Sequence, residues 1–104
     1  WRRYRNRRIR LGRKFVKKAA KMPEVRIVSL TGMQLTVLTD SAQARTYVRL
    51  NALVDGINRS MFFGDPFTLV VRETSSPEDE KALLSAPGIL YVREGDAPSP
   101  VNQD

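Results

Sequence analysis

The stretch "VRIVSLTGMQLTVLT", residues 25–39, decides the fold of this 104-residue chain. Apolar and polar side chains alternate from residue 33 to residue 37, which is the pattern of a half-buried strand. In the middle of the stretch, Thr31-Gly32 offers a two-residue turn, because glycine tolerates the positive φ that tight hairpin turns require. The stretch therefore predicts a β-hairpin whose strands cover residues 25–30 and 33–39.

A helix is predicted to follow the hairpin, over residues 41–61. Asp40 and Gln43 resemble a capping box at its start, and Gly64 is expected to cap its end in a left-handed conformation. Apolar residues at helical spacing predict its buried stripe. These residues are Ala44, Tyr47, Val48, Val54, Ile57 and Met61.

Two further strands and a short helix are predicted after that. Residues 67–72 are rich in β-branched side chains, and residues 89–93 form the last strand. Between them, Ser76 as N-cap and Pro77 at the first helical position predict a helix that continues to residue 85. The two strands end alike, in "VVRE" and "YVRE", so they would align two Arg-Glu pairs if they were neighbours.

The order helix, strand, strand, helix, strand, helix, strand predicts an α+β fold. The hairpin is antiparallel, whereas strand-helix-strand connections favour parallel strands with a right-handed crossover. We therefore expect a small mixed sheet with helices mainly on one face, preceded by a basic N-terminal helix.

Positive charge is concentrated in residues 1–22, which contain eleven Lys and Arg and no acid, in a chain of net charge +7. Apolar residues at 11, 15, 16, 19 and 22 predict an amphipathic helix that ends before Pro23. Before Ile9 the segment is almost entirely charged and is expected to need a partner or to stay mobile. The chain thus divides into a basic arm (1–22), a globular domain (23–94) and a flexible tail (95–104) with two prolines.

Residue types argue against catalysis. The chain has no Cys and no His, which removes disulfides, thiol nucleophiles, imidazole general bases and thiolate or imidazole zinc sites. The six glycines are isolated, so no phosphate-binding loop is present in the sequence. We expect a non-enzymatic protein without a cofactor or a bound metal.

For the basic arm, two partners are considered beside a merely solvated helix face. The first is an anionic membrane surface on the cytoplasmic side, or the matrix or stroma side of an organelle, with aromatic residues at headgroup level and a transmembrane segment expected before Trp1. The alternative is RNA, as in a ribosome-associated protein. The candidate contact residues are the same for both: Trp1, Arg2, Arg3, Tyr4, Arg5, Arg7, Arg8, Arg10, Arg13, Lys14, Lys17, Lys18 and Lys21.

The globular domain is expected to act as a protein-interaction or assembly module. Arg45 and Arg49 lie one turn apart on the predicted second helix and are candidates for contact with a protein partner. Phe62, Phe63 and Phe67 in "FFGDPF" are further candidates, since these rings either close the core or form an exposed tip.

Overall fold

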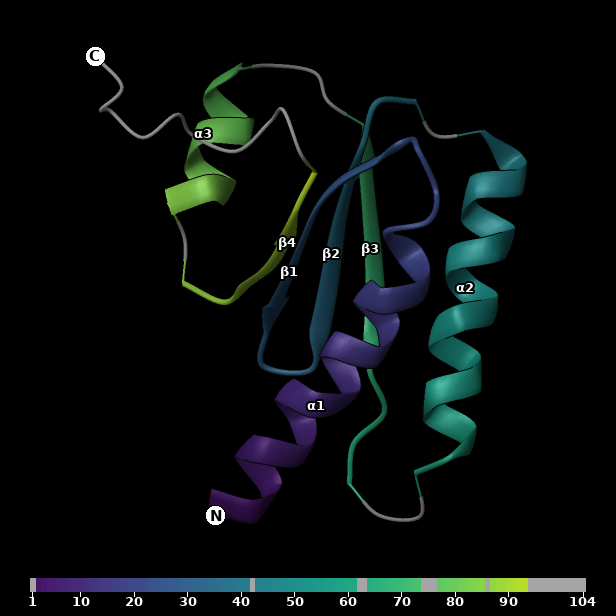
Figure 1. Cartoon of the computed structure of the whole chain (residues 1–104), viewed down its shortest axis with the longest axis vertical. Coiled ribbons are helices and arrows are strands. Elements are labelled where there is room, and N and C mark those ends of the chain that lie inside the picture. Colours follow the sequence, from purple (N-terminus) through teal and green to yellow (C-terminus); the bar gives the residue numbers. More distant parts are fainter. Residues whose placement is uncertain (1, 42, 62–63, 74–76, 86, 94–104) are drawn as a thin grey trace.

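The computed structural model describes residues 2–41, 43–61, 64–73, 77–85 and 87–93 (Figure 1). The helices are α1 (Arg2–Ala19), α2 (Ala44–Arg59) and α3 (Pro77–Ser85). The strands are β1 (Val25–Thr31), β2 (Gln34–Thr39), β3 (Thr68–Glu73) and β4 (Ile89–Val92).

The strands form one mixed sheet in the order β3-β2-β1-β4. β1 pairs antiparallel with β2 and with β4, while β3 pairs parallel with β2. Helices α1 and α2 pack against each other and against the sheet, and α3 stands apart from them, near β4 (Figure 1). The predicted α+β fold with a hairpin-based mixed sheet is confirmed.

The hairpin turn lies one residue later than predicted. Thr31 pairs with Gln34, so the two turn residues are Gly32 and Met33. Gly32 has a φ of 59°, and no other residue type has a positive φ in the described part of the chain. A positive φ at the first turn position alone is the pattern of a type II′ turn, which requires glycine there.

The last strand is not a neighbour of the third. β3 and β4 occupy opposite edges of the sheet, so the expected alignment of their Arg-Glu motifs is wrong. The crossover from β2 through α2 to β3 leaves β2 with a partner on each side, and the only open positions for a new strand are the edges. β4 takes the edge beside β1, where Ile27 pairs with Val92 and Val28 with Tyr91.

α1 begins at Arg2 and is one continuous helix. The backbone before Ile9 is thus helical in this structure, while the expectation that this part needs a partner or stays mobile remains a prediction. Arginine and lysine are good helix formers, and each like-charge pair at helical spacing costs only about 0.2–0.5 kcal/mol. Once the second half of α1 is packed, extension toward the N-terminus needs no further nucleation.

The core lies between the sheet and the α1–α2 layer. It unites α1, both hairpin strands, α2 and the residue before β3, and its buried members are Leu11, Phe15, Ala19, Met22, Val25, Val28, Leu30, Leu35, Val37, Leu50, Val54 and Phe67. α1 approaches the sheet closely at Gly12, where a Cβ atom would lie 2.9 Å from Leu90 Cδ1 and 3.2 Å from Leu30 Cδ2. A small residue at position 12 thus sets the distance between α1 and the strands.

The predicted phase and caps of α2 are partly wrong. Its buried residues are Thr46, Leu50 and Val54, while Tyr47 and Val48 are exposed. Gln43 is the N-cap residue and makes no side-chain capping hydrogen bond. The helix starts at Ala44, too late for Asp40 to be its N-cap.

The C-terminal end of α2 also differs from the expectation. Ser60 is its C-cap residue, in a right-handed conformation. Gly64 has the expected positive φ of 96°, but it lies in the loop before β3 and not at the helix end.

Candidate anion-binding surface

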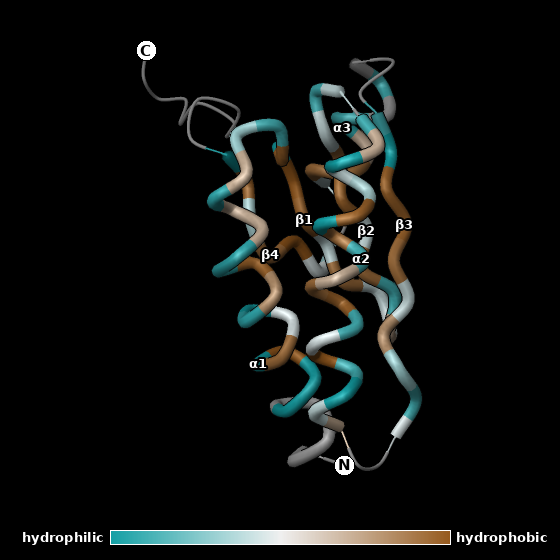
Figure 2. Tube along the Cα trace, turned by 90° about the vertical axis from the view of Figure 1, so that its right-hand side faces the viewer, coloured by the Kyte–Doolittle hydropathy of each residue, from teal (hydrophilic) through white to brown (hydrophobic). Residues whose placement is uncertain are grey.

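One side of α1 packs into the core, and the other presents cations to solvent. Leu11, Phe15 and Ala19 are buried on the inner side. Among the described side chains of α1 and the turn after it, the exposed cations are Arg10, Arg13, Lys14, Lys17, Lys18 and Lys21. Figure 2 shows these hydrophilic positions recurring along the outer side of α1, against largely hydrophobic strands.

The remaining candidates of the basic segment are not among the exposed cations that the structure describes. Arg7 and Arg8 are half-buried, and Arg8 Nη1 donates a hydrogen bond of 2.6 Å to the carbonyl oxygen of Gly32. Arg8 therefore ties α1 to the hairpin turn. Arg2, Arg3, Tyr4 and Arg5 belong to the helical backbone of α1, and Trp1 lies outside the described residues.

α2 extends the cationic side of α1 into a layer. Arg45 and Arg49 are exposed as expected, and Arg59, which sequence reasoning did not select, is exposed as well. α1 contributes ten Lys and Arg and α2 three, against the single acid Asp55. We call these two helices the cationic layer. Positive charge thus belongs to a two-helix layer, and not to the N-terminal segment alone.

The exposed cations of α1 are not neutralised by carboxylates. Among the residues that the structure describes, the ion pairs join Arg26 to Asp40 and Glu80, and Arg93 to Asp40. Arg26 lies on β1, Asp40 and Arg93 directly follow β2 and β4, and Glu80 lies on α3. The positive field of the cationic layer is consequently directed to solvent.

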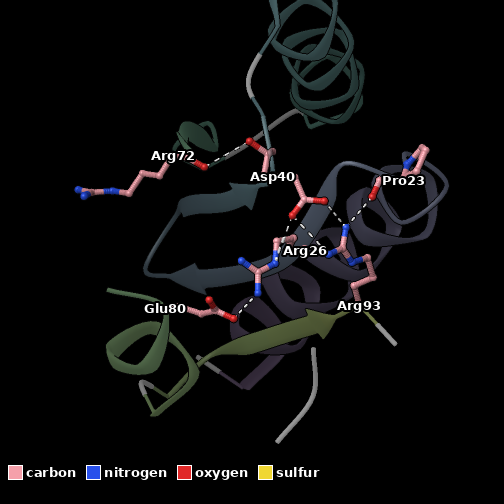
Figure 3. A network of polar contacts seen from close by, with 7 residues as sticks. Pro23, Arg26, Asp40, Arg72, Glu80 and Arg93 are labelled. Atoms are coloured by element: carbon pink, nitrogen blue, oxygen red, sulfur yellow. Dashed lines mark hydrogen bonds and ion pairs between the residues drawn. The ribbon is translucent and has the colours of Figure 1, made fainter. Parts of the chain in front are cut away.

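The strand arginines form a network at one end of the sheet, which Figure 3 shows. Arg93 Nη1 and Nη2 lie 2.6 and 3.3 Å from the two carboxylate oxygens of Asp40, and Arg26 Nε lies 3.6 Å from Asp40 Oδ1. Arg26 also pairs with Glu80 of α3. The side chain of Arg26 is only 11% exposed. Through these ion pairs the network connects β1, the residue after β4, α3 and the end of β2. It also explains why Asp40 does not cap α2.

Glu24 contacts the first turn of α2 through Thr46. Thr46, which is buried, donates a hydrogen bond of 2.8 Å from Oγ1 to Glu24 Oε2. A backbone hydrogen bond, this bond from Thr46 and the charges of Arg45 and Arg49 lower the pKa of Glu24, against the opposing effect of burial. Glu24 therefore reduces the positive field at the N-terminal end of α2.

An elongated hollow lies between α1 and α2. It consists of two parts of about 440 and 390 Å³, which share Lys18, Ala52 and Leu53. We call it the interhelical groove. Five cations line it, and no acidic residue does so within the described part of the chain; the cations are Lys14, Lys17, Lys18, Lys21 and Arg49.

The aromatic candidates divide between the core and the undescribed part of the chain. Phe67 is buried, and its backbone N–H and carbonyl are both bound by the side-chain amide of Asn58. Phe67 therefore closes the core. Phe62 and Phe63 lie outside the described residues. Among the described residues, the large exposed apolar side chains are Tyr47 and Val48 of α2, which are 41% and 67% exposed.

The described residues contain no candidate metal site and no candidate membrane-spanning helix. No group of acidic side chains there is arranged to hold a metal ion. No helix there combines the length and the apolar character that crossing a membrane would require.

Comparison with known proteins gives no relative. No protein-family model, no curated protein and no solved structure matches this chain.

Proposed function

We propose that this protein docks on an anionic membrane surface through the cationic layer, as a non-enzymatic domain that offers its other side to a protein partner. The observation that carries the proposal is the charge of the layer, in which the two helices contain thirteen Lys and Arg and one Asp. Six exposed cations lie along this side: five on α1, and Lys21 just after it. Each cation held near an anionic lipid surface contributes about 1 kcal/mol. Six of them are enough to hold a small domain against such a surface.

Two apolar side chains in the same layer support a lipid partner. Tyr47 and Val48 are exposed on α2, beside Arg45 and Arg49. An aromatic ring with a polar tip suits the headgroup region of a bilayer, where one end is wet and the other apolar. The layer therefore combines charge with a small apolar contact.

RNA is the alternative partner, since the same cations would bind phosphates. Sequence-tolerant recognition of single strands also uses aromatic rings on which bases stack. Of the described aromatic side chains, Phe15 and Phe67 are buried, Tyr91 packs against the core, and Tyr47 is exposed. Among the described rings, Tyr47 on its helix offers bases little to stack on, which favours lipid over RNA as the partner.

Vesicle co-sedimentation tests the proposal. We expect the protein to sediment with vesicles of phosphatidylcholine and phosphatidylserine, but not with phosphatidylcholine alone. The double variant Arg13→Gln/Lys17→Gln should weaken the partition coefficient roughly 30-fold, which corresponds to about 2 kcal/mol. The matched control, Arg72→Gln/Lys81→Gln, removes two exposed cations from β3 and α3 and should change it little.

A gel shift with single-stranded RNA across a salt series is the companion measurement. Tight RNA binding that weakens steeply with salt, together with no sedimentation on anionic vesicles, would overturn the membrane proposal in favour of RNA.

A further inference from the structure

A flat cationic layer is sufficient for electrostatic docking, and the interhelical groove exceeds that requirement. The groove runs between α1 and α2, and both cations and apolar side chains line it. Ligand sites in proteins commonly have volumes of about 300–1,000 Å³ and combine apolar walls with a few polar groups. Each part of the groove falls within that range.

One end of the groove suits a phosphate. The part of about 390 Å³ is lined by Lys18 and Lys21 from the α1 side and by Arg49 from α2. Arginine presents a planar fork that matches phosphate oxygens, and lysine adds a compact charge. Cations from two elements thus border one hollow, without a competing carboxylate among its described lining residues.

The other end suits an alkyl chain. The part of about 440 Å³ is lined by Phe15, Leu53 and Ile57, together with the small residues Ala52 and Gly56. A Cβ atom added to Gly56 would meet no atom within 4 Å, so the missing side chain leaves open space. The two ends share Lys18, Ala52 and Leu53, which makes the charged end continuous with the apolar end.

We propose that the interhelical groove binds a single molecule of an anionic phospholipid, with its phosphate at Lys18, Lys21 and Arg49 and one acyl chain along Leu53 and Gly56. This inference rests on the proposed membrane docking and makes it more specific. A nucleic-acid strand would use the cations but gain little from the apolar lining, because Phe15 is fully buried and the other apolar side chains of the groove are aliphatic and offer no ring for stacking. An amphiphile uses both.

The test separates the groove from the layer. Binding of a short-chain, water-soluble phosphatidic acid below its micellar concentration is measured by isothermal titration calorimetry, beside the vesicle assay. Gly56→Leu fills the groove without changing charge, and it should weaken binding of the soluble lipid about tenfold or more, a loss of at least about 1.4 kcal/mol, while vesicle sedimentation is retained. Asn51→Leu adds the same side chain to an exposed position of α2 that does not line the groove and should change neither result.

A second variant examines the charged end. Lys18→Gln should weaken binding of the soluble lipid more than Lys81→Gln, which removes an exposed cation from α3. Leucine is a better helix former than glycine and has free space at position 56, so circular dichroism should show that Gly56→Leu is folded.

The outcomes distinguish the two proposals. Vesicle binding without any binding of the soluble lipid, or equal binding of the soluble lipid by the wild type and Gly56→Leu, overturns the groove proposal and leaves membrane docking in place. Failure of vesicle binding overturns both.

Discussion

Arginine serves opposite purposes in two regions of this molecule. At the end of the sheet, Arg26 and Arg93 are matched with Asp40 and Glu80, and Arg26 is almost fully covered (Figure 3). In the cationic layer, the exposed cations of α1 have no carboxylate partner among the described residues. In the first region the charges connect secondary-structure elements, and in the second they remain available to an external partner.

A count of charges along the sequence does not predict which charges pair within the fold and which face solvent. Pairing depends on which strands become neighbours, and β4 became the neighbour of β1. Substitutions in the two regions should therefore change the free energy of unfolding by different amounts, and even in opposite directions.

Arg26→Ala is expected to have the largest effect on stability. It leaves Glu80, which is 22% exposed, without its partner and removes the link between β1 and α3. Breaking a buried ion pair by removing one member costs about 3 kcal/mol or more in free energy of unfolding. Urea denaturation followed by circular dichroism measures this free energy. A loss of less than about 1 kcal/mol, as for an exposed ion pair, would show that the network does not stabilise the fold.

Gly12→Val is the next largest, because it pushes the cationic layer away from the sheet. Its side chain would overlap the methyl groups of Leu90 and Leu30, and overpacking of this kind costs about 2 kcal/mol. Gly56→Val is the matched control on α2, where nothing lies within 4 Å of the new Cβ. Thermal melting of both variants should show a clear loss for the first alone.

Thr46→Val removes the hydrogen bond to Glu24 and should lower the free energy of unfolding by about 1 kcal/mol. The folded state lowers the pKa of Glu24 from its ordinary value of 4.5, so its contribution to stability is present above that pH and is lost as the pH falls through the folded pKa. The variant should therefore lose less stability on acidification than the wild type. Denaturation at neutral and acidic pH measures the difference, and parallel pH profiles would contradict it.

Lys17→Gln should have the smallest effect, with the opposite sign. Lys17 is exposed, and its neighbours one turn away are Arg13, Lys14 and Lys21, all of the same charge. Removing it relieves repulsion and should raise stability by about 0.3 kcal/mol at low salt. The gain should vanish at high salt, and a decrease comparable to that of Arg26→Ala would contradict the division between the two regions.

Local patterns predicted those parts of the fold that depend on neighbouring residues. The alternation in 25–39 predicted the hairpin, and Pro77 predicted the start of α3. Where the outcome depended on distant residues, prediction failed. Asp40 looked like a helix cap, but its carboxylate is bound to Arg93, 53 residues later in the chain. Tyr47 and Val48 looked like part of the buried stripe, whereas Leu50 and the bond from Thr46 to Glu24 set the phase of α2.

The candidate site was likewise only half visible in the sequence. The density of cations before Met22 predicted an interaction surface, and the structure adds that six of these cations have exposed side chains. The groove was not foreseen, because it depends on the packing of α1 beside α2 and on Gly56 facing it. Periodicity within one helix contains no information about the spacing between two helices.

The strand order also has a kinetic consequence. Val28 pairs with Val37, nine positions later, and with Tyr91, sixty-three positions later. A hairpin closed by a two-residue turn forms within about 1–10 μs, whereas the distant pairing must await the intervening chain. β1 is thus joined early on one side and late on the other. When the folded protein opens locally, the amide hydrogens that bond β1 to β4 should exchange with solvent before those that bond β1 to β2.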